Sequence, residues 1–297
     1  MRASVGLGSA AALLACGAHV DAAHDVPPSA KPPVAGDVVT PRDDTGTAVD
    51  VTDPPPTPAI VDLDGDGLDD VAEGAMARAY LPYLSTHSQD DCPLSGLVFR
   101  VHSHPDDARF VAIVYSRLYQ RDCGVVAGIG GHVGDDEAFG ITIDPSVAAP
   151  AGIIAMVAVS HQNTTCERDT VCGICPGLDA CDTGDLGGAQ FPVVYASKDK
   201  HASAVSLAHG CSLFGSCFDR CELAPATIGL PMVNVGEPDH PLVHDLTTDG
   251  FIKASDGWTE SSLQHYDPWG PSDFGTAGVV SGDMVDPAFV APVCAGS

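Results

Sequence analysis

The chain is poor in basic side chains. Its 297 residues include 13 lysines and arginines against 40 aspartates and glutamates, which gives a formal net charge of −27. Nucleic acid is bound by basic surfaces, and anionic lipid headgroups repel an acidic one, so this balance argues against both partners. It suits an exported, soluble protein that meets divalent cations, because clustered carboxylates repel one another until a cation screens them.

The chain also lacks the short motifs by which many enzymes are recognised. It has no G-x-S-x-G nucleophile elbow, no H-E-x-x-H zinc motif and no phosphate-cradling P-loop. It contains no internal repeat. Any chemistry must therefore come from residue clusters that these motifs do not describe.

Long apolar runs are missing except at the N-terminus. Arg2 is followed by small apolar residues over 3–15, a run too short to span a bilayer but typical of a signal peptide. The run ends in Leu-Leu-Ala-Cys at Cys16, which resembles the bacterial lipoprotein cleavage box, where the cysteine is acylated and becomes the new N-terminus. Ordinary cleavage near Ala22 or Ala23 is the alternative. The sequence thus predicts an extracytoplasmic protein, either anchored in the cell envelope by lipid on Cys16 or secreted.

The cysteine count agrees with this compartment. There are eleven cysteines, and if Cys16 carries lipid, the remaining ten predict five disulfides in an exported chain. Cys172 and Cys175 form a C-x-x-C pair, which in a cytosolic protein would indicate zinc or redox chemistry. Here the pair lies in a loop rich in glycine and aspartate, and the oxidising compartment favours structural disulfides.

The clearest single motif is a calcium-type loop. Residues 62–73 read Asp-Leu-Asp-Gly-Asp-Gly-Leu-Asp-Asp-Val-Ala-Glu, a full match to D-x-[DN]-x-[DN]-G-x5-E. Gly67 stands where the chain must turn sharply. Ca²⁺ is a hard ion that takes oxygen ligands, and the loop offers carboxylates and one backbone carbonyl at the required positions: Asp62, Asp64, Asp66, Leu68, Asp70 and Glu73.

Two features separate this loop from paired calcium sensors. The eighth position, usually a small apolar residue that pairs with a second loop, is Asp69. The chain has no second loop of this type. The pattern resembles the isolated Asp-x-Asp-Gly-Asp-Gly loops of extracellular bacterial proteins. We therefore expect Ca²⁺ to fix local structure here and to carry no signal.

Composition divides the chain into a tether and a folded head. Proline, alanine, aspartate and threonine dominate the stretch after Cys16, and such sequence cannot bury a core but acts as a semi-rigid spacer. We predict a signal peptide with its cleavage box, a disordered tether, the calcium loop with a helix, a β-sandwich core and an irregular C-terminal extension packed on it. In chain order these parts span 1–16, 17–58, 59–84, 85–221 and 222–297.

Short apolar runs in the head predict strands. They are separated by turns of glycine, proline and aspartate, and they lie at 97–102, 110–118, 138–143, 153–160 and 192–196. The run at 153–159 also fits a turn of buried helix. Helical spacing of apolar residues over 71–84 predicts a short helix before them. The expected fold class is mostly β: a disulfide-stapled β-sandwich with a short N-terminal helix after the calcium loop and long irregular loops.

A second cluster of potential metal ligands precedes the predicted strand at 138–143. His132, Asp135 and Glu137 are spaced as H-x-x-D-x-E. Residues two apart on a strand point to the same face, so Asp135 and Glu137 should lie side by side, and His132 can join them from the preceding turn. Two carboxylates and one imidazole suit a divalent cation, Ca²⁺ or Mg²⁺, with open positions for water or a ligand. An acidic turn with a locally hydrogen-bonded histidine is the alternative interpretation.

These residues resemble the Gly-His-Arg-His-Asp-Trp-Glu motif that the necrosis- and ethylene-inducing-like proteins carry on a β-sandwich. Gly131, His132, Asp135 and Glu137 match that heptapeptide. Gly134 also matches the related His-x-Gly-Asp-Trp-Glu of a vacuolar-sorting-associated family. The resemblance implies a β-sandwich whose matching His, Asp and Glu hold a divalent cation near a membrane-binding face.

The resemblance also has departures and extensions. The second His and the Trp of the heptapeptide are Gly134 and Asp136 here, which argues against plant-cell lysis. Residues 193–202 are similar to the Val-Tyr-x-Ala-Lys-x-x-His-Ala segment of the vacuolar-sorting-like family, which implies that His201 approaches the same site. Asp122 is the nearest counterpart of an aspartate that lies upstream in the toxin family.

Three functions fit these observations. The leading hypothesis is an extracytoplasmic calcium-binding lipoprotein whose head binds a membrane lipid or a glycan surface with the help of the second cation and without covalent catalysis. The enzyme alternative is a metal-dependent hydrolase in which His132, Asp135 and Glu137 hold the metal and His201 acts as acid or base. The third is a purely structural envelope protein, which would keep the calcium loop but not the clustering of the second site.

Overall fold

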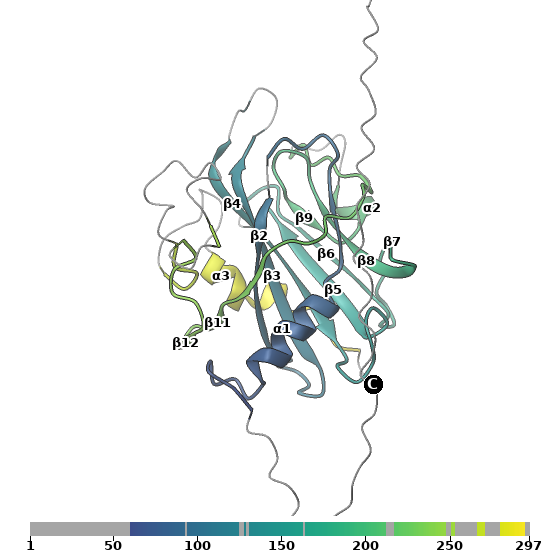
Figure 1. The fold of residues 1–297 in the computed structure, drawn as a ribbon. Coiled ribbons are helices and arrows are strands. Elements are labelled where there is room, and N and C mark those ends of the chain that lie inside the picture. The colour runs from purple at the N-terminus through teal and green to yellow at the C-terminus, as the bar shows by residue number, and fades with distance from the viewer. Residues whose placement is uncertain are drawn as a thin grey trace, which may run out of the picture. The chain divides into compact units, whose positions relative to one another are not determined.

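The head is built mainly from β-strands. The computed structural model describes residues 60–92, 94–124, 128, 131–162, 164–211, 217–247, 251–252, 266–270 and 280–294, arranged as in Figure 1. The helices within these ranges are α1 (Asp70–Ala79), α2 (Leu207–Gly210), α3 (Val280–Val285) and the 3-10 helix η4 (Pro287–Phe289). None of these helices is long and apolar enough to cross a membrane. The predicted signal peptide, Cys16 and the tether lie outside the described residues.

The larger sheet has six strands in the order β10-β2-β3-β4-β5-β6. They are β2 (Leu94–Ser103), β3 (Val111–Asp122), β4 (His132–Ile143), β5 (Ile153–Ser160), β6 (Arg168–Gly173) and β10 (Met232–Asn234). Successive strands from β2 to β6 are antiparallel, as hairpin connections require, whereas β10 pairs with β2 in parallel. Valine and isoleucine recur in the central strands, where branched side chains pack well on the pleated surface.

The smaller sheet runs in the order β1-β8-β7, with β9 on the far side of β8. Its strands are β1 (Tyr83–Thr86), β7 (Thr183–Leu186), β8 (Ala189–Ala196) and β9 (Ser203–Ala204). Gly187 and Gly188 form the turn between β7 and β8 with φ of +65° and +89°, a conformation that side chains disfavour. A separate hairpin is formed by β11 (Gly236–Glu237) and β12 (His240–Pro241).

The main core lies between the two sheets. Phe99, Tyr115 and Phe139 project from one face of the larger sheet, and Leu84 and Val194 of the smaller sheet belong to the same buried cluster. The rings of Tyr115 and Phe139 stack with their centroids 5.0 Å apart. Helix α1 packs against this cluster as well. These two packed sheets confirm the predicted mostly-β fold.

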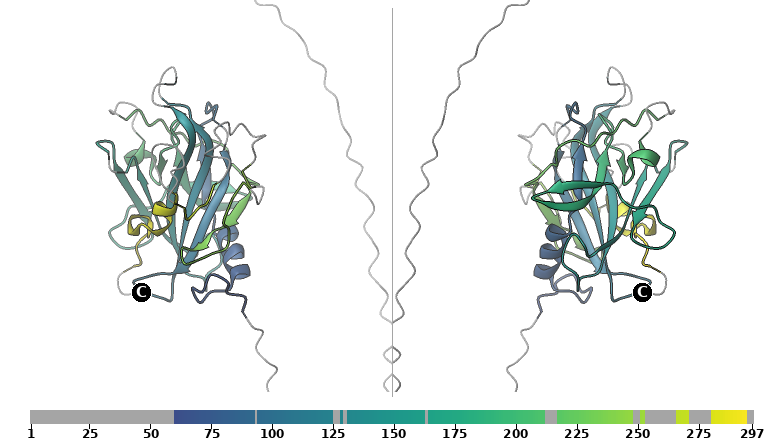
Figure 2. Two further views of the ribbon diagram at one scale, coloured as in Figure 1. Left: turned by 90° about the vertical axis from the view of Figure 1, so that its left-hand side faces the viewer. Right: turned by 90° about the vertical axis from the view of Figure 1, so that its right-hand side faces the viewer.

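The opposite face of the larger sheet is covered by the C-terminal segment. Val98, Val114 and Ala138 on this face pack with residues that follow β10, namely Val235, Leu246, Ile252, Tyr266, Val280, Met284 and Phe289. The left view of Figure 2 presents this side, with α3, and the right view presents the side of the β7–β8 hairpin. Because both faces of the sheet are covered, every residue of β5 is buried. The strand therefore lacks the alternation of buried and exposed residues seen in a strand with one solvent-exposed face.

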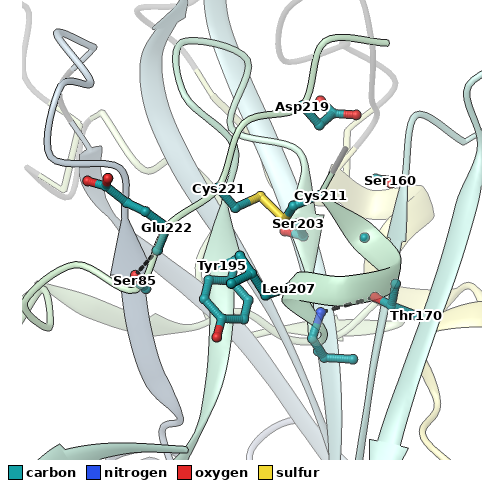
Figure 3. The surroundings of a disulfide bond; sticks show 12 residues. Ser85, Ser160, Thr170, Tyr195, Ser203, Leu207, Cys211, Asp219, Cys221 and Glu222 are labelled. Atoms are coloured by element: carbon teal, nitrogen blue, oxygen red, sulfur yellow. Dashed lines mark hydrogen bonds between the residues drawn. A yellow bond between two sulfur atoms is a disulfide. The ribbon is translucent and has the colours of Figure 1, made fainter. Parts of the chain in front are cut away.

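Five disulfides confirm the number expected from the sequence. They are Cys92–Cys123, Cys166–Cys217, Cys172–Cys181, Cys175–Cys294 and Cys211–Cys221. The C-x-x-C cysteines are thus divided between two bonds. Figure 3 shows the Cys211–Cys221 bond, after which the chain runs past β1 and the hydroxyl of Ser85 donates to the carbonyl of Glu222 at 2.7 Å. So many disulfides indicate an extracytoplasmic protein.

Three boundaries differ from the sequence-based expectation. The helix ends at Ala79, because residues 83–86 pair with β8 as strand β1 instead of continuing the helix. The strand expected at 138–143 begins at His132, since the polar residues before Ala138 still pair with β3. The C-terminal segment, expected to be irregular, supplies β10 to the larger sheet. The H-x-x-D-x-E cluster therefore lies within a strand and not on the turn before it.

Candidate metal centre and a buried cluster of charges

The calcium-type loop forms tight turns before α1. Gly65 and Gly67 have φ of +78° and +92°, which glycine adopts at no steric cost. The carboxylate of Asp62 accepts hydrogen bonds from the N–H groups of both glycines, at 2.7 and 3.1 Å. The N–H of Leu68 donates to Asp66 at 2.7 Å. The backbone thus curls around the first and third carboxylates of the motif.

All five carboxylates of the motif converge. Asp62, Asp64 and Asp66 each place one oxygen within 4.8 Å of the others, and Asp64, Asp70 and Glu73 do the same. Asp64 is 2% exposed and Glu73 is fully buried. Both oxygens of Asp64 and Oε1 of Glu73 have no hydrogen-bond partner among the described residues. Buried oxygens without a donor are costly, and a bound cation would satisfy them.

Burial raises the pKa of three of these carboxyl groups, Asp64, Asp66 and Glu73. The pKa of Glu73 rises to about 8 and that of Asp64 to about 6. The main cause in both is burial, which disfavours the charged form, and repulsion from neighbouring carboxylates adds to it. Without a cation, keeping all of the loop carboxylates ionised therefore costs free energy, because they are buried and repel one another.

Residues far along the chain line the other side of this site. The side-chain amide of Asn234 on β10 donates to Oε2 of Glu73 at 2.6 Å. Gly236 follows with φ of +72°, and a Cβ there would lie 3.1 Å from the Cβ of Asp64. Neither contact could be predicted, because no spacing rule links the loop to strands more than a hundred residues later in the chain.

Glu237 on β11 adds a further carboxylate on this side of the site. Burial is the main cause of the raised pKa of Asp64 and Asp66, and repulsion from Glu237 adds to it. It is held by Arg100 on β2, which donates to its two oxygens at 2.8 and 2.7 Å. The same guanidinium donates to the carbonyl of Met284 on α3 at 2.9 Å. One bidentate pair thus connects the surroundings of the loop to the C-terminal segment.

Asp69, the unusual residue at the eighth loop position, has a local role. It is the N-cap of α1, and its Oδ1 accepts from the N–H of Ala72 at 2.9 Å. Its Oδ2 accepts from the N–H of Val61, also at 2.9 Å. A capping aspartate stabilises a helix, because it accepts from a backbone N–H that has no partner within the helix. The departure from the paired-loop pattern therefore serves helix initiation.

A second charged group lies in the core, where His201 is held between two carboxylates. Its Nδ1 is 2.7 Å from Asp135 and its Nε2 is 3.3 Å from Asp90. Tyr119 stacks on the imidazole with the ring centroids 3.6 Å apart. Burial by itself lowers the pKa of His201, but the hydrogen bond with Asp135 and the proximity of Asp90 outweigh burial and raise the pKa to about 9. At neutral pH the ring is therefore an imidazolium.

A buried arginine lies next to this imidazolium. Arg117 is fully buried, and its Nη2 donates to the hydroxyl of Ser203 at 2.5 Å and to the carbonyls of His201 and Tyr195 at 3.1 and 3.3 Å. Glu137, its cross-strand partner on β4, accepts from the N–H of Ser203 at 3.1 Å. Burial holds the pKa of Glu137 well above its usual range, although the arginine opposes this. These contacts tie the two sheets together.

His132 lies at the start of β4, beyond a bulge. Arg121 on β3 faces both Val133 and Gly134, and Gly134 takes φ of +73°. The Nε2 of His132 is 3.7 Å from Asp122, and its Nδ1 is 2.7 Å from the carbonyl of Gly134. His132 therefore lies within β4, opposite Asp122, and not on the preceding turn where the sequence placed it.

The structure therefore divides the predicted second site into pairs. Asp135 is hydrogen-bonded to His201, and His132 is paired with Asp122. In the described part of the chain, no group of three ligand atoms within 4.8 Å includes His132, Asp135 or Glu137. Asp90 was not predicted, because it lies in a loop far along the chain from both histidines.

Asp136 lies on the other face of β4, toward α3. It is 6% exposed, and neither of its oxygens has a hydrogen-bond partner among the described residues. Burial raises its pKa well above the usual range, and repulsion from Asp283 on α3 adds to this. Burial likewise raises the pKa of Asp283 to about 6. Two buried carboxyl groups that influence each other in this way favour a state in which they hold a proton.

We expect Asp136→Asn to stabilise the protein at neutral pH. A carboxyl group with a raised pKa in the folded state costs stability as pH rises from its unfolded pKa, 3.8 for Asp283, to its folded pKa of about 6. Asparagine keeps the shape and removes one of the two charges. The free energy of unfolding at about pH 7 should rise by roughly 2 kcal/mol, and its decline above about pH 4 should become shallower. Urea denaturation over this pH range measures both, with the exposed Asp239→Asn as control. An unchanged pH dependence would contradict the prediction.

No protein-family model and no curated protein sequence matches the chain. Among solved structures, NLPPya in complex with mannosamine is 16% identical with a TM-score of 0.33, and NLPPya in complex with glucosamine is 14% identical with a TM-score of 0.30. A structure described as a toxin fold for microbial attack and plant defense is 14% identical with a TM-score of 0.31. Each match covers 59% of this chain and 82% of the other. Likenesses of this size do not establish a shared arrangement and carry no conclusion about the site.

Proposed function

We propose that this is an extracytoplasmic calcium-binding protein in which Ca²⁺ held by residues 62–73 fastens the start of the head to its larger sheet. The observation that carries the proposal is the buried pair Asp64 and Glu73, whose carboxylates keep three oxygens without a hydrogen-bond donor among the described residues. Buried anions are tolerated when they are paired or bind a metal. A site made of oxygen ligands alone suits Ca²⁺ or Mg²⁺ and disfavours zinc or copper.

The position of the loop gives the cation a structural role. Leu68 and Met76 pack against the main core on one side of the loop and helix. Glu73 reaches β10 on the other side through Asn234. A cation that joins the carboxylates of the loop to Glu73 would therefore hold the loop, α1 and β10 together. This accords with a calcium site that fixes structure and carries no signal.

The wider proposal is that this head is displayed at the cell envelope. A lipid on Cys16 and the proline-rich segment would place it there, where it would bind a membrane lipid or a glycan. The support is the sequence of the N-terminus together with the disulfide content. Membrane fractionation of the full chain and of its Cys16→Ala variant tests the anchor.

Calorimetric Ca²⁺ titration of the full chain tests the calcium site. We expect one binding event in the parent and a loss of at least about tenfold in affinity in Glu73→Gln, which keeps the shape of the side chain but removes its charge. The matched control is Asp69→Asn, because asparagine caps a helix as well as aspartate and this residue contributes no ligand to the converging group. Equal affinities in the parent and Glu73→Gln would contradict the site.

A second site for a divalent cation near His132 is the other candidate. Its presence would favour a head that binds a ligand, and its absence a head with a purely structural role. It is favoured by the buried carboxylates of Asp122 and Asp135, which repel each other. It is opposed by His201, whose imidazolium already compensates Asp135. A second event in the same titration, lost in His132→Ala, would support the second site and justify screens of lipids, glycans and hydrolysable esters. Its absence with Ca²⁺ and Mg²⁺ would leave the structural role alone.

A further inference from the structure

Asn234 holds the last residue of the calcium-type loop from outside. Its Nδ2 donates to Oε2 of Glu73 at 2.6 Å. Its Oδ1 accepts from the N–H of Gly236 at 3.1 Å, which turns the NH₂ group toward the glutamate. The strand that carries it is fixed by parallel pairing with β2, where Asn234 lies opposite Phe99. The donor therefore belongs to a strand of the larger sheet.

This hydrogen bond makes the two oxygens of Glu73 unequal. Oε2 is engaged by Asn234, whereas Oε1 is buried without a partner among the described residues. Oxygens of Asp64 and Asp70 lie within 4.8 Å of a Glu73 oxygen. In loops of this kind the final glutamate ordinarily gives both oxygens to Ca²⁺. Here the neighbouring strand holds one of them.

The space around the site is also limited. The backbone of Gly236 approaches Asp64 so closely that a Cβ would lie 3.1 Å from the Cβ of that residue. Glu237, the nearest further carboxylate, is bound at both oxygens by Arg100 and does not need a cation. The wall formed by β10 and β11 therefore adds no free carboxylate to the loop. Ca²⁺ tolerates six to eight ligands, whereas Mg²⁺ requires six in near-octahedral arrangement at shorter distances.

We infer that Asn234 is a positioning residue that holds Glu73 as a one-oxygen ligand, so that Mg²⁺ competes with Ca²⁺ for this loop. The inference rests on the proposed function, because it concerns the cation choice of the same site. Losing one oxygen lowers the ligand number toward six, which removes the advantage of the larger ion. A fixed ligand also suits the stricter geometry that Mg²⁺ demands.

The test is Ca²⁺ titration of the full chain with and without millimolar Mg²⁺, for the parent and for Asn234→Ala. In the parent, Mg²⁺ weakens the apparent affinity for Ca²⁺. In Asn234→Ala, Glu73 is free to turn both oxygens to the ion, and the ratio of the Mg²⁺ to the Ca²⁺ dissociation constant rises about tenfold, the size of effect that outer-shell partners of metal ligands commonly have. A merely structural role of Asn234 would weaken both ions alike and leave this ratio unchanged.

Met232→Ala is the matched control, because it disturbs the packing of β10, and the side chain of Met232 cannot donate a hydrogen bond to Glu73. It should leave the ratio of dissociation constants as in the parent. Three results would overturn the inference without contradicting the calcium site. They are a Ca²⁺ isotherm of the parent that Mg²⁺ does not change, an unchanged ratio in Asn234→Ala, and an equal change of the ratio in Met232→Ala. A parent that binds neither ion overturns the proposed function itself.

Discussion

His201→Ala should lower the free energy of unfolding by about 3–5 kcal/mol at neutral pH. The imidazolium lies between Asp135 and Asp90, whose side chains are 3% and 2% exposed. Removing it leaves two buried carboxylates without their cation, which costs more than the pair contributes when intact. His201 has φ of +58°, and alanine, like histidine, carries a Cβ in this conformation, so the substitution acts mainly through the side chain. Urea denaturation followed by circular dichroism measures it.

The chain offers a matched exposed pair as a control. His209 lies 3.6 Å from Asp179, and the two side chains are 68% and 81% exposed. An ion pair of this kind contributes at most about 1 kcal/mol, so His209→Ala should be nearly neutral. The double variant His201→Ala with Asp135→Asn should lose less stability than the two single variants added together, because one unpaired carboxylate is gone. Equal losses in His201→Ala and His209→Ala would contradict the buried imidazolium.

Features that depend on neighbours in the sequence could be predicted. The disulfide number follows from a parity count, and the strand at 153–160 from one apolar run that the structure places at the same residues. The convergence of the loop carboxylates follows from a spacing of two residues and a glycine turn. In each case the physical cause acts within a dozen residues or on composition alone.

Features that depend on distant partners could not be predicted. β10 is only three residues long, and it is a strand because β2 offers a free edge for parallel pairing. Asp90 and Asn234 are ordinary polar residues in the sequence and acquire their roles only when folding brings them to His201 and Glu73. His132 was expected on the turn before the strand, but distant pairing with β3 extends the strand back to it, across a bulge opposite Arg121. Sequence patterns describe local periodicity, so they cannot predict contacts between residues that are far apart in the sequence.

Calcium should raise the stability of the chain, and chelation should lower it by a comparable amount. An ion that binds only the folded state stabilises it by about 4 kcal/mol at a thousandfold excess over its dissociation constant. The folded state without the ion keeps Asp64 and Glu73 buried and close together, and burial raises the pKa of Glu73 to about 8. A buried carboxyl group that must be ionised or hold a proton against its usual pKa weakens the fold. Thermal unfolding in excess Ca²⁺ and in excess chelator measures the difference.

Which of the two proteins is more stable, the parent or Glu73→Gln, should depend on whether Ca²⁺ or chelator is present. In chelator the variant should unfold at a higher temperature than the parent, because a neutral amide replaces a buried carboxylate and can donate to the unpartnered oxygens of Asp64. In Ca²⁺ the parent should be the more stable, because it alone keeps the full charge of the site. Asp69→Asn, which retains the helix cap and all converging carboxylates, should respond to Ca²⁺ like the parent. If the parent were more stable than Glu73→Gln in both conditions by the same margin, Glu73 would be acting through packing and its bond to Asn234, and the loop would not be a calcium site.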